Sequence, residues 1–431
     1  MVYNVLRKIS FVILGVALLN LFAYAVVYVH EGGENLGFLT HPLKEFSEFP
    51  KVIFEVAQEV EKPEYSIVAD SNFLSENKMS YDLYGMNGRV EKGNWLISLK
   101  NLRNDSIIHE WNLLEKDFHK TDREFTHSEP RGPILLADKS VIVTCDESKN
   151  MFRIDKDSKV IWHNTDQQYH HAINLSADSN IWASSRMKLS NKKNRLSYWD
   201  NSICKIDLKT GETLYKKSMT KVFHENNLEY MLFGKSNRIH DSGEDPMHLN
   251  DVEPILEDGK YWKKGDVLLS FRHISAVLLF RPSTGKVIRV IQGSFYGQHD
   301  VDILNDSTIT VFNNNISTIK KGTWGIDTSF VAVNETFNRI SGVVAYHFND
   351  STFTTLLSDQ FEEEKVYTFT QGLHHVLSNG DVFVESQNNG KIYVLSKEGT
   401  LLKKYYNDLE DIYVQRPHWT RTYEDINFLN Q

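Results

Sequence analysis

Histidines recur along this chain at the start of strand-like segments, and they carry the side chains best suited to chemistry. The set comprises His170, His171, His248, His299, His374 and His375. Imidazole has an ordinary pKa of about 6.5, so its neutral form can accept a sulfuryl or phosphoryl group covalently and pass it on. The transferred group carries negative charge on its oxygens, and the guanidinium of Arg272, within GDVLLSFRH, matches a tetrahedral oxyanion. These residues together predict an anion-handling active site.

The elements that must position these histidines form a repeating β-rich pattern from about residue 81 onward. Five segments contain strand-like runs separated by turns, and they begin at Pro133, His170, His248, Gln298 and Leu373. A sixth and less regular segment reads YDLYGMNGRVEKGNWLISLK. Four short strands per repeat are typical of a β-propeller. We therefore expect an all-β fold, a six-bladed β-propeller, with an array of β-sandwiches as the alternative.

In a propeller, the first strand of each blade lines the central channel. The histidines open those first strands, so we expect them to point toward the axis, with Arg272 one strand after His248. Gly211 and Gly285 follow Thr in two similar phrases, KIDLKTGETLY and LFRPSTGKVIRV. Each is expected in a tight turn, where a left-handed backbone favours glycine.

The N-terminal part of the chain differs from the rest. Residues 9–29 read ISFVILGVALLNLFAYAVVYV without a charge, which is about the length of a membrane-spanning helix. Arg7 and Lys8 precede this run, so the positive-inside rule places the N-terminus in the cytoplasm and the bulk of the chain in the periplasm or extracellular space. A cleaved signal peptide is the alternative, because Ala23-Tyr24-Ala25 resembles a cleavage site.

Three regions follow from these patterns. We predict a transmembrane anchor or signal peptide over 1–30, a linker with a short amphipathic helix over 31–78, and the six-bladed propeller over 79–431. The amphipathic helix rests on apolar residues at roughly helical spacing after His41, namely Phe46, Phe49, Val52, Ile53 and Val56. Formal net charge is −9 and no basic run occurs, so no nucleic-acid partner is expected.

The two cysteines leave two possibilities open. Outside the cytosol, Cys145 and Cys204 could form a disulfide. Each also lies in a strand-like run, where a free cysteine behaves as a small buried apolar residue, and we favour that interpretation.

Four motifs make the chain resemble the bacterial arylsulfate sulfotransferases. They are HHAINLSADSNIW, HLNDVEPI, GDVLLSFRHISAVLLFRPSTGKVI and GQHDVDIL, and the resemblance covers about 133–404. It implies a six-bladed propeller that moves a sulfuryl group from an aryl sulfate to a phenol without a nucleotide donor. His299 matches the family's sulfated nucleophile, and His171 or its neighbour His170, His248 and Arg272 match the residues that bind the sulfuryl group. The family's N-terminal β-domain and its close cysteine pair are not evident here.

The resemblance implies a ping-pong reaction through a sulfohistidine, with His299, His248, Arg272 and His171 catalytic. As further substrate-binding residues we take His170, Asn250, His374 and His375, and we expect Asp300 to pair with a backbone amide or a histidine. No P-loop or dinucleotide motif is visible, and we expect no cofactor.

Two other functions stay open as alternatives. Histidines and carboxylates can hold zinc or copper, but no HExxH motif is present and a central arginine would repel a cation, so we predict no metal. The chain could also be a non-catalytic, membrane-anchored propeller that binds a ligand or a protein partner.

Overall fold

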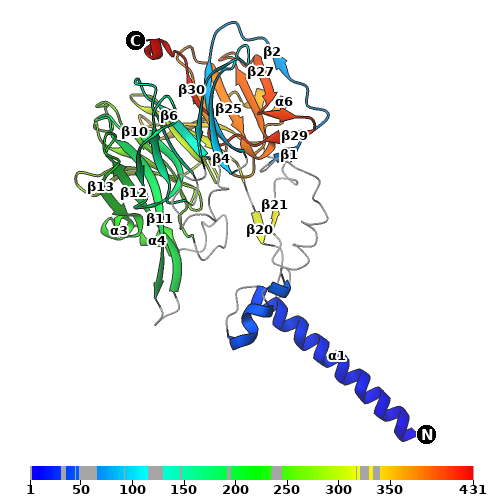
Figure 1. Ribbon diagram of the computed structural model, residues 1–431. Helices are drawn as coiled ribbons and strands as arrows, with labels where there is room; N and C mark the ends of the chain where they lie inside the picture. The colour runs from blue at the N-terminus through cyan, green and yellow to red at the C-terminus, as the bar shows by residue number, and fades with distance from the viewer. Residues whose placement is uncertain are drawn as a thin grey trace. The chain divides into compact units, whose positions relative to one another are not determined.

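The computed structural model describes residues 2–30, 35–43, 45–47, 66–91, 93–114, 130–145, 148–191, 196–233, 245–316, 318–320, 330–332 and 340–430. These residues divide into two compact units, 1–63 and 64–431. The first unit contains helix α1 (Val2–His30) and a short 3-10 helix, η1 (Gly37–Leu39). The second unit is built from antiparallel β-sheets (Figure 1). The prediction of an all-β fold is confirmed.

Helix α1 includes the apolar run 9–29. In the part of the chain that the structure describes, no helix combines the length and hydropathy that a bilayer span requires. The predicted anchor and its localisation stay predictions from the sequence. Residues 40–43 and 45–47 are helical, but Phe49, Val52, Ile53 and Val56 of the predicted amphipathic helix lie outside the described residues.

The second unit contains six sheets of four or five strands, which we number 1 to 6 in chain order. Sheet 1 consists of β30 (Arg421–Tyr423), β3 (Tyr84–Glu91), β4 (Asn94–Asn101) and β5 (Ile107–Leu113). Sheet 2 consists of β6 (Pro130–Leu135), β7 (Val141–Cys145), β8 (Met151–Ile154) and β9 (Val160–Asn164). Sheet 3 consists of β10 (Gln168–Leu175), β11 (Ile181–Asn191), β12 (Leu196–Ile206) and β13 (Thr213–Ser218).

Sheets 4 to 6 repeat the same plan. Sheet 4 consists of β14 (Leu249–Pro254), β15 (Val267–Phe271), β16 (Ala276–Arg281) and β17 (Lys286–Ile291). Sheet 5 consists of β18 (His299–Asn305), β19 (Thr308–Asn313), β22 (Gly342–His347) and β23 (Thr352–Leu356). Sheet 6 consists of β24 (Leu373–Val376), β25 (Val382–Ser386), β26 (Lys391–Leu395), β27 (Leu401–Tyr406) and the short β2 (Glu76–Asn77). Each of the six predicted repeats therefore supplies one sheet.

Smaller elements connect or flank these sheets. Strand β1 (Ser66–Val68) pairs with β29 (Tyr413–Gln415), which also pairs with β28 (Leu409–Glu410), and β20 (Thr318–Lys320) pairs with β21 (Phe330–Ala332). The helices are α3 (Met219–Glu225), α4 (Glu229–Phe233), α6 (Ser358–Glu363), η5 (Gln387–Asn389) and η6 (Asn427–Asn430). Since β1 and β2 pair with C-terminal strands, the end of the predicted linker 31–78 takes part in the β-structure. The domain boundaries as a whole stay predictions.

Apolar side chains pack between neighbouring sheets. Strand β15 shows how: Val267, Leu269 and Phe271 belong to one apolar cluster, whereas Leu268 belongs to another. Successive side chains of a strand point to opposite faces, so a strand buried on both faces is a continuous apolar run. Comparable clusters join sheets 1 and 2, 2 and 3, 3 and 4, 4 and 5, and 5 and 6. A further cluster contains Leu373 and Phe383 of sheet 6 together with Leu83 and Leu102, which flank β3 and β4.

The predicted glycine turns are confirmed. Gly211 and Gly285 have φ of 76° and 69°, and they lie between β12 and β13 and between β16 and β17. A Cβ at Gly211 would lie 2.7 Å from the ring of Trp162, so this position also leaves no room for a side chain. Cys204 is a free, buried cysteine whose thiol contacts the carbonyl oxygen of Ala183, as the favoured interpretation expects.

The C-terminal strand closes sheet 1 and also contacts sheet 2. Tyr84 to Met86 of β3 pair with Tyr423 to Arg421 of β30, and the Tyr423 hydroxyl accepts a hydrogen bond of 2.8 Å from the Leu135 amide of β6. Leu135 is buried, so this amide cannot exchange its partner for water.

We expect Tyr423→Phe to lower the free energy of unfolding by about 1 to 2 kcal/mol, because it leaves the buried Leu135 amide without an acceptor. Chemical denaturation followed by circular dichroism would measure the loss. Tyr230→Phe is the matched control, since Tyr230 is exposed. Equal stability of Tyr423→Phe and the wild type would contradict this role of the hydroxyl.

Candidate active site

Three consecutive first strands bring the predicted histidines together. His171 lies in β10, His248 immediately precedes β14, and His299 is the first residue of β18. Strand β14 contacts both β10 and β18. The side chains therefore converge from sheets 3, 4 and 5.

The backbone is irregular where these histidines lie. His171 and His248 have φ of 60° and 55°, and Asp300, next to His299, has φ of 51°. The left-handed region costs a non-glycine residue roughly 1 to 2 kcal/mol. The strand registers also shift here, between Tyr169 and Ile173, Leu249 and Asp251, and His299 and Val301. Such bulges redirect side chains, and they often occur beside active sites.

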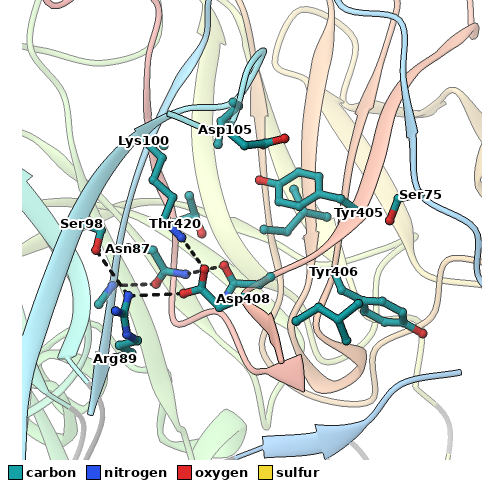
Figure 2. A pocket seen from close by; sticks show the side chains of 16 residues that line it. Ser75, Asn87, Arg89, Ser98, Lys100, Asp105, Tyr405, Tyr406, Asp408 and Thr420 are labelled. Carbon is teal, nitrogen blue, oxygen red and sulfur yellow. Dashed lines mark hydrogen bonds and ion pairs between the residues drawn. The ribbon is translucent and has the colours of Figure 1, made fainter. Parts of the chain in front are cut away.

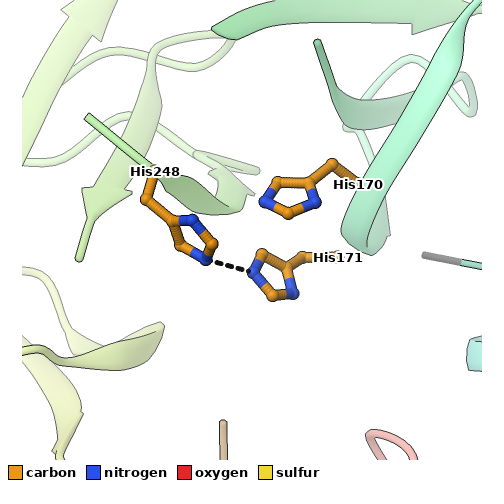
Figure 3. A group of neighbouring side chains, drawn as sticks. All are labelled: His170, His171 and His248. Carbon is orange, nitrogen blue, oxygen red and sulfur yellow. Dashed lines mark hydrogen bonds between the residues drawn. The ribbon is translucent and has the colours of Figure 1, made fainter. Parts of the chain in front are cut away.

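The imidazole rings lie in direct contact with one another. The ring centroid of His171 lies 4.1 Å from that of His170, 5.1 Å from that of His248 and 5.8 Å from that of His299. Figure 3 shows His170 and His171 approaching His248 from the neighbouring strand. His170, His171 and His299 are buried, and His248 is partly buried. The structure thus gathers four of the six predicted histidines.

A hydrogen-bond chain fixes the tautomers of two of these rings. Arg131 Nη1 lies 3.2 Å from His171 Nδ1, His171 Nε2 lies 3.0 Å from His248 Nε2, and His248 Nδ1 lies 2.8 Å from Asp245 Oδ2. A guanidinium can only donate, so His171 accepts at Nδ1 and carries its hydrogen on Nε2. That hydrogen points at His248 Nε2, and His248 Nδ1 donates to the carboxylate of Asp245. The direction of every bond follows from the arginine at one end and the carboxylate at the other.

Arg272 is held beside this chain by neutral groups. Its backbone amide donates to the carbonyl oxygen of His248 over 3.0 Å, which confirms that it lies one strand after His248. His273 Nδ1 lies 2.6 Å from the Asp245 carbonyl oxygen and donates to it, so His273 Nε2 accepts from Arg272 Nη1 over 3.0 Å. Nε of Arg272 is buried without a hydrogen-bond partner among the described residues. The positive charge of this guanidinium is therefore available to an anion.

Burial favours the neutral form of His248, His273 and His299. Burial, and then the Arg272 guanidinium, hold the pKa of His299 well below its ordinary value. Burial lowers the pKa of His248 to about 4, although the Asp245 carboxylate opposes the shift. Burial alone would raise the pKa of Asp245, but the hydrogen bond from His248 holds it well below the usual range. Burial lowers the pKa of Arg272 to about 10, so Arg272 still carries its charge at neutral pH.

Asn314 orients the ring of His299. Asn314 Nδ2 donates to the carbonyl oxygens of Thr368 and Gln371 over 3.0 and 2.6 Å, which fixes the orientation of the amide. Its Oδ1 therefore accepts from His299 Nδ1 over 2.7 Å. His299 Nε2 keeps its lone pair and receives only a long contact, 3.3 Å, from the Gln371 amide. Nε2 is therefore the ring nitrogen that carries no hydrogen.

The remaining predicted residues lie in different environments. Asn250 is buried, its Nδ2 donates to the Gln298 carbonyl oxygen over 2.7 Å, and its Oδ1 has no partner among the described residues. His374 and His375 lie in a separate group, beside the carboxylates of Asp300 and Asp302. The His374 amide donates to Asp300 Oδ2 over 2.7 Å. Asp300 therefore pairs with a backbone amide, one of its two predicted partners, and its Oδ2 lies 3.0 Å from His374 Nδ1. The predicted set of histidines divides into two groups.

Sequence reasoning did not single out four residues of this site: Arg131, Asp245, His273 and Asn314. Two of them left a usable signal: Asp245 precedes His248 by three residues within GEDPMHLND, and His273 directly follows Arg272. Arg131 and Asn314 come close to the histidines only through the pairing of separate strands and turns.

Two groups in this cluster have ligand atoms close enough for a metal ion: His170, His171 and His248, and Asp245, His248 and His273. The ring nitrogens of His171 and His248 already take part in the hydrogen-bond chain that ends at Arg131, and His273 Nε2 already accepts from Arg272. The guanidiniums of Arg131 and Arg272 contact these histidines, and their positive charge favours an anion over a cation at this site.

A separate hollow of about 380 Å³ contains none of the predicted residues. Figure 2 shows it with Lys100 and Arg89 directed at the carboxylate of Asp408. Tyr405 and Tyr406 of β27 form its other side. Because its cations are paired with Asp408, this hollow offers less positive charge than the histidine cluster.

Comparisons with known proteins agree with the motifs. A family model described as arylsulfotransferase (ASST) matches residues 132–407, whereas no curated protein matches the chain. A solved protein of unknown function from Bacteroides caccae is 13% identical with a TM-score of 0.47, over 78% of this chain and 97% of its own. Virginiamycin B lyase from Staphylococcus aureus is 12% identical with a TM-score of 0.37, over 78% of this chain and 88% of its own. At such TM-scores we base no argument on the solved structures.

We expect Asn314→Ala to weaken the preference of His299 for the tautomer with its hydrogen on Nδ1. Removing a hydrogen bond worth about 1 kcal/mol shifts the ratio of the Nδ1–H to the Nε2–H form by about fivefold toward Nε2–H. Nitrogen-15 NMR of the imidazole rings would measure this ratio. Asn305→Ala, at the exposed end of β18, which begins at His299, is the control and should leave the ratio unchanged. An unchanged ratio in Asn314→Ala would refute the positioning role.

Proposed function

Because this chain belongs to the arylsulfotransferase family, we propose that it moves a sulfuryl group from an aryl sulfate to a phenol through a sulfated His299. The observation that carries the proposal is the geometry of His299. Its Nδ1 hydrogen is donated to Asn314, its Nε2 lone pair meets only the long 3.3 Å contact from the Gln371 amide, and the Arg272 guanidinium helps to keep the ring neutral. A neutral imidazole beside a fixed positive charge suits nucleophilic attack on an anionic ester.

We also propose that the six sheets are the blades of a six-bladed propeller. Support comes from the apolar clusters, because each sheet packs on the next and Leu373 and Phe383 of sheet 6 pack with residues that flank the strands of sheet 1. Sheet 1 combines the C-terminal strand β30 with β3 from the N-terminal part of the unit. In this arrangement β10, β14 and β18 line the channel.

The first half-reaction forms a nitrogen–sulfur bond. His299 Nε2 attacks the sulfur of the aryl sulfate, the bond from sulfur to the aryl oxygen breaks, and the phenolate leaves. The ring then carries the SO₃ group on Nε2 and a positive charge, which the hydrogen bond from Nδ1 to Asn314 Oδ1 stabilises. No further reactant is required at this step.

Charge on the three sulfuryl oxygens is balanced by groups already in place. Arg272 contributes a guanidinium whose Nε has no partner among the described residues. His171 carries a hydrogen on Nε2 that it can donate to an oxygen in place of His248. These donors are fixed before substrate binds, so little reorganisation is needed as the charge develops.

The second half-reaction reverses the first with a new phenol. The acceptor phenol loses its proton to water, the resulting phenolate oxygen attacks sulfur, the bond from sulfur to Nε2 breaks, and His299 regains its lone pair. The proposed donor is an aryl sulfate, and neither half-reaction uses a nucleotide sulfate.

We expect His299→Asn to lower the transfer of sulfate from 4-nitrophenyl sulfate to phenol by about 10³-fold or more, because the nucleophile is lost. Mass spectrometry of the wild type after exposure to the donor should show an adduct of about 80 Da, one SO₃ group, on His299. His224→Asn is the control, since His224 is an exposed helical residue. Unchanged transfer by His299→Asn would contradict the assignment of His299 as the nucleophile. If the wild type turns over no aryl sulfate at all, the result favours the non-catalytic alternative.

The depressed pKa of His299 predicts the pH profile of adduct formation. A lowered pKa leaves the ring neutral at a pH where an ordinary imidazole is protonated. With 4-nitrophenyl sulfate, whose leaving group needs no proton, we expect a constant single-turnover rate from about pH 8 to about 5.5. An imidazole of ordinary pKa would lose roughly tenfold in rate over that range. A tenfold decrease, with circular dichroism unchanged, would contradict a depressed pKa.

A further inference from the structure

A second group of titratable side chains lies on the same strands as the histidine cluster and takes no part in the proposed reaction. Glu253 of β14, Asp300 and Asp302 of β18, and His374 of β24 line a hollow of about 250 Å³. Strand β18 contacts both β14 and β24. Asp300 directly follows the proposed nucleophile His299 in the chain.

The neighbouring cation, Arg421, makes no direct ion pair with the carboxylates of this group among the described residues. Arg421 also lines the hollow, but its Nη2 donates to the carbonyl oxygen of Ile173 over 2.6 Å and to Asn174 Oδ1 over 3.1 Å. Among the described residues, no ion pair joins Arg421 to Asp300, Asp302 or Glu253. Buried carboxylates are costly unless each takes up a proton or has a counter-ion, so a bound cation would stabilise the charged form of this group.

His374 provides an observation independent of the acidic residues. Its side chain is fully buried, and its Nε2 lies 2.8 Å from Thr310 Oγ1. Its Nδ1 lies 3.0 Å from Asp300 Oδ2 but makes no hydrogen bond with any described residue, because the angle is wrong for one. A buried ring nitrogen beside a carboxylate oxygen to which it is not hydrogen-bonded is the arrangement of two ligands that share an ion.

The spacing of the ligand atoms fits such an ion. One atom each from Asp300, Asp302 and His374 lie within 4.8 Å of one another. Metal–ligand bonds of about 2.0 to 2.2 Å place the ligands of one ion roughly 3 to 4.4 Å apart, so small side-chain movements suffice.

We propose that Asp300, Asp302 and His374 form a binding site for a divalent cation. Two carboxylates with one imidazole suit ions that accept both oxygen and nitrogen, such as Mn²⁺ or Zn²⁺, better than Ca²⁺. The ion links β18 to β24 and so braces the strand that presents His299. This site goes beyond sulfuryl transfer and does not depend on it, since its ligands are distinct from the groups that handle the sulfate.

Binding of Mn²⁺ to the full-length protein, free of any affinity tag and dialysed against a chelator, tests this site. Electron paramagnetic resonance counts free Mn²⁺ during a titration, and we expect one saturable ion per chain. Asp302→Asn should weaken binding by at least about tenfold, because a charged ligand is replaced by a neutral amide. Asp157→Asn removes an exposed carboxylate far along the chain and should leave binding unchanged.

Two results would overturn the proposal. One is the absence of saturable binding by the wild type with Mn²⁺ and, in a competition assay, with Zn²⁺. The other is binding that Asp302→Asn and His374→Gln leave intact, which would assign the ion to another place such as the His170, His171 and His248 group. Circular dichroism of each variant distinguishes lost ligands from lost fold, and a rise in the melting temperature of the wild type on adding Mn²⁺ gives a measurement that needs no variant. Because all readouts are of binding, failure of sulfate transfer would leave them unaffected.

Discussion

The pairing of the C-terminal strand β30 with β3 is the contact on which the rest of the β-structure depends. It completes sheet 1 from two ends of the unit, and through Tyr423 it places a hydrogen-bond acceptor at the buried amide of Leu135 in sheet 2. Without β30, the backbone groups along one edge of β3 would lose their partners, and an open strand edge is also a template for unwanted pairing. The apolar clusters between sheets then hold the first strands in fixed order, and those strands carry both groups of functional side chains.

Groups that can only donate, or only accept, set the direction of the hydrogen bonds in the histidine cluster. Arg131 fixes the tautomer of His171, Asp245 fixes that of His248, and the anchored amide of Asn314 fixes that of His299. The result is a set of neutral rings beside two buried guanidiniums, which is an environment for an anion. A short distance along β18, Asp300 and Asp302 line the second hollow together with Arg421, and there we propose a cation. One strand thus passes through two sites of opposite charge.

Much of this could be predicted from the repeats and motifs. The six segments that contain strand-like runs each supply a sheet, and the turn glycines Gly211 and Gly285 have left-handed backbones as expected. The convergence of His171, His248, His299 and Arg272 was also expected. His374 was not separable by sequence, because it opens a strand-like run in the same way as the others. The bulges beside His171, His248 and His299 redirect their side chains, and no periodicity of residue types records such a local shift.

The sequence by itself therefore determined the β-rich class, the number of repeats, the family and the candidate nucleophile, since local alternation and short motifs encode all of these. Only the tertiary structure decided which side chains share a site and what protonation state each holds. Arg131, Asp245 and Asn314 reach the histidines from different sheets and turns, and the pKa of His299 depends on burial and on a guanidinium that comes from another strand. Burial and electrostatic contact are properties of three-dimensional proximity, so residues distant in the chain set them, and the sequence pattern around His299 does not contain them.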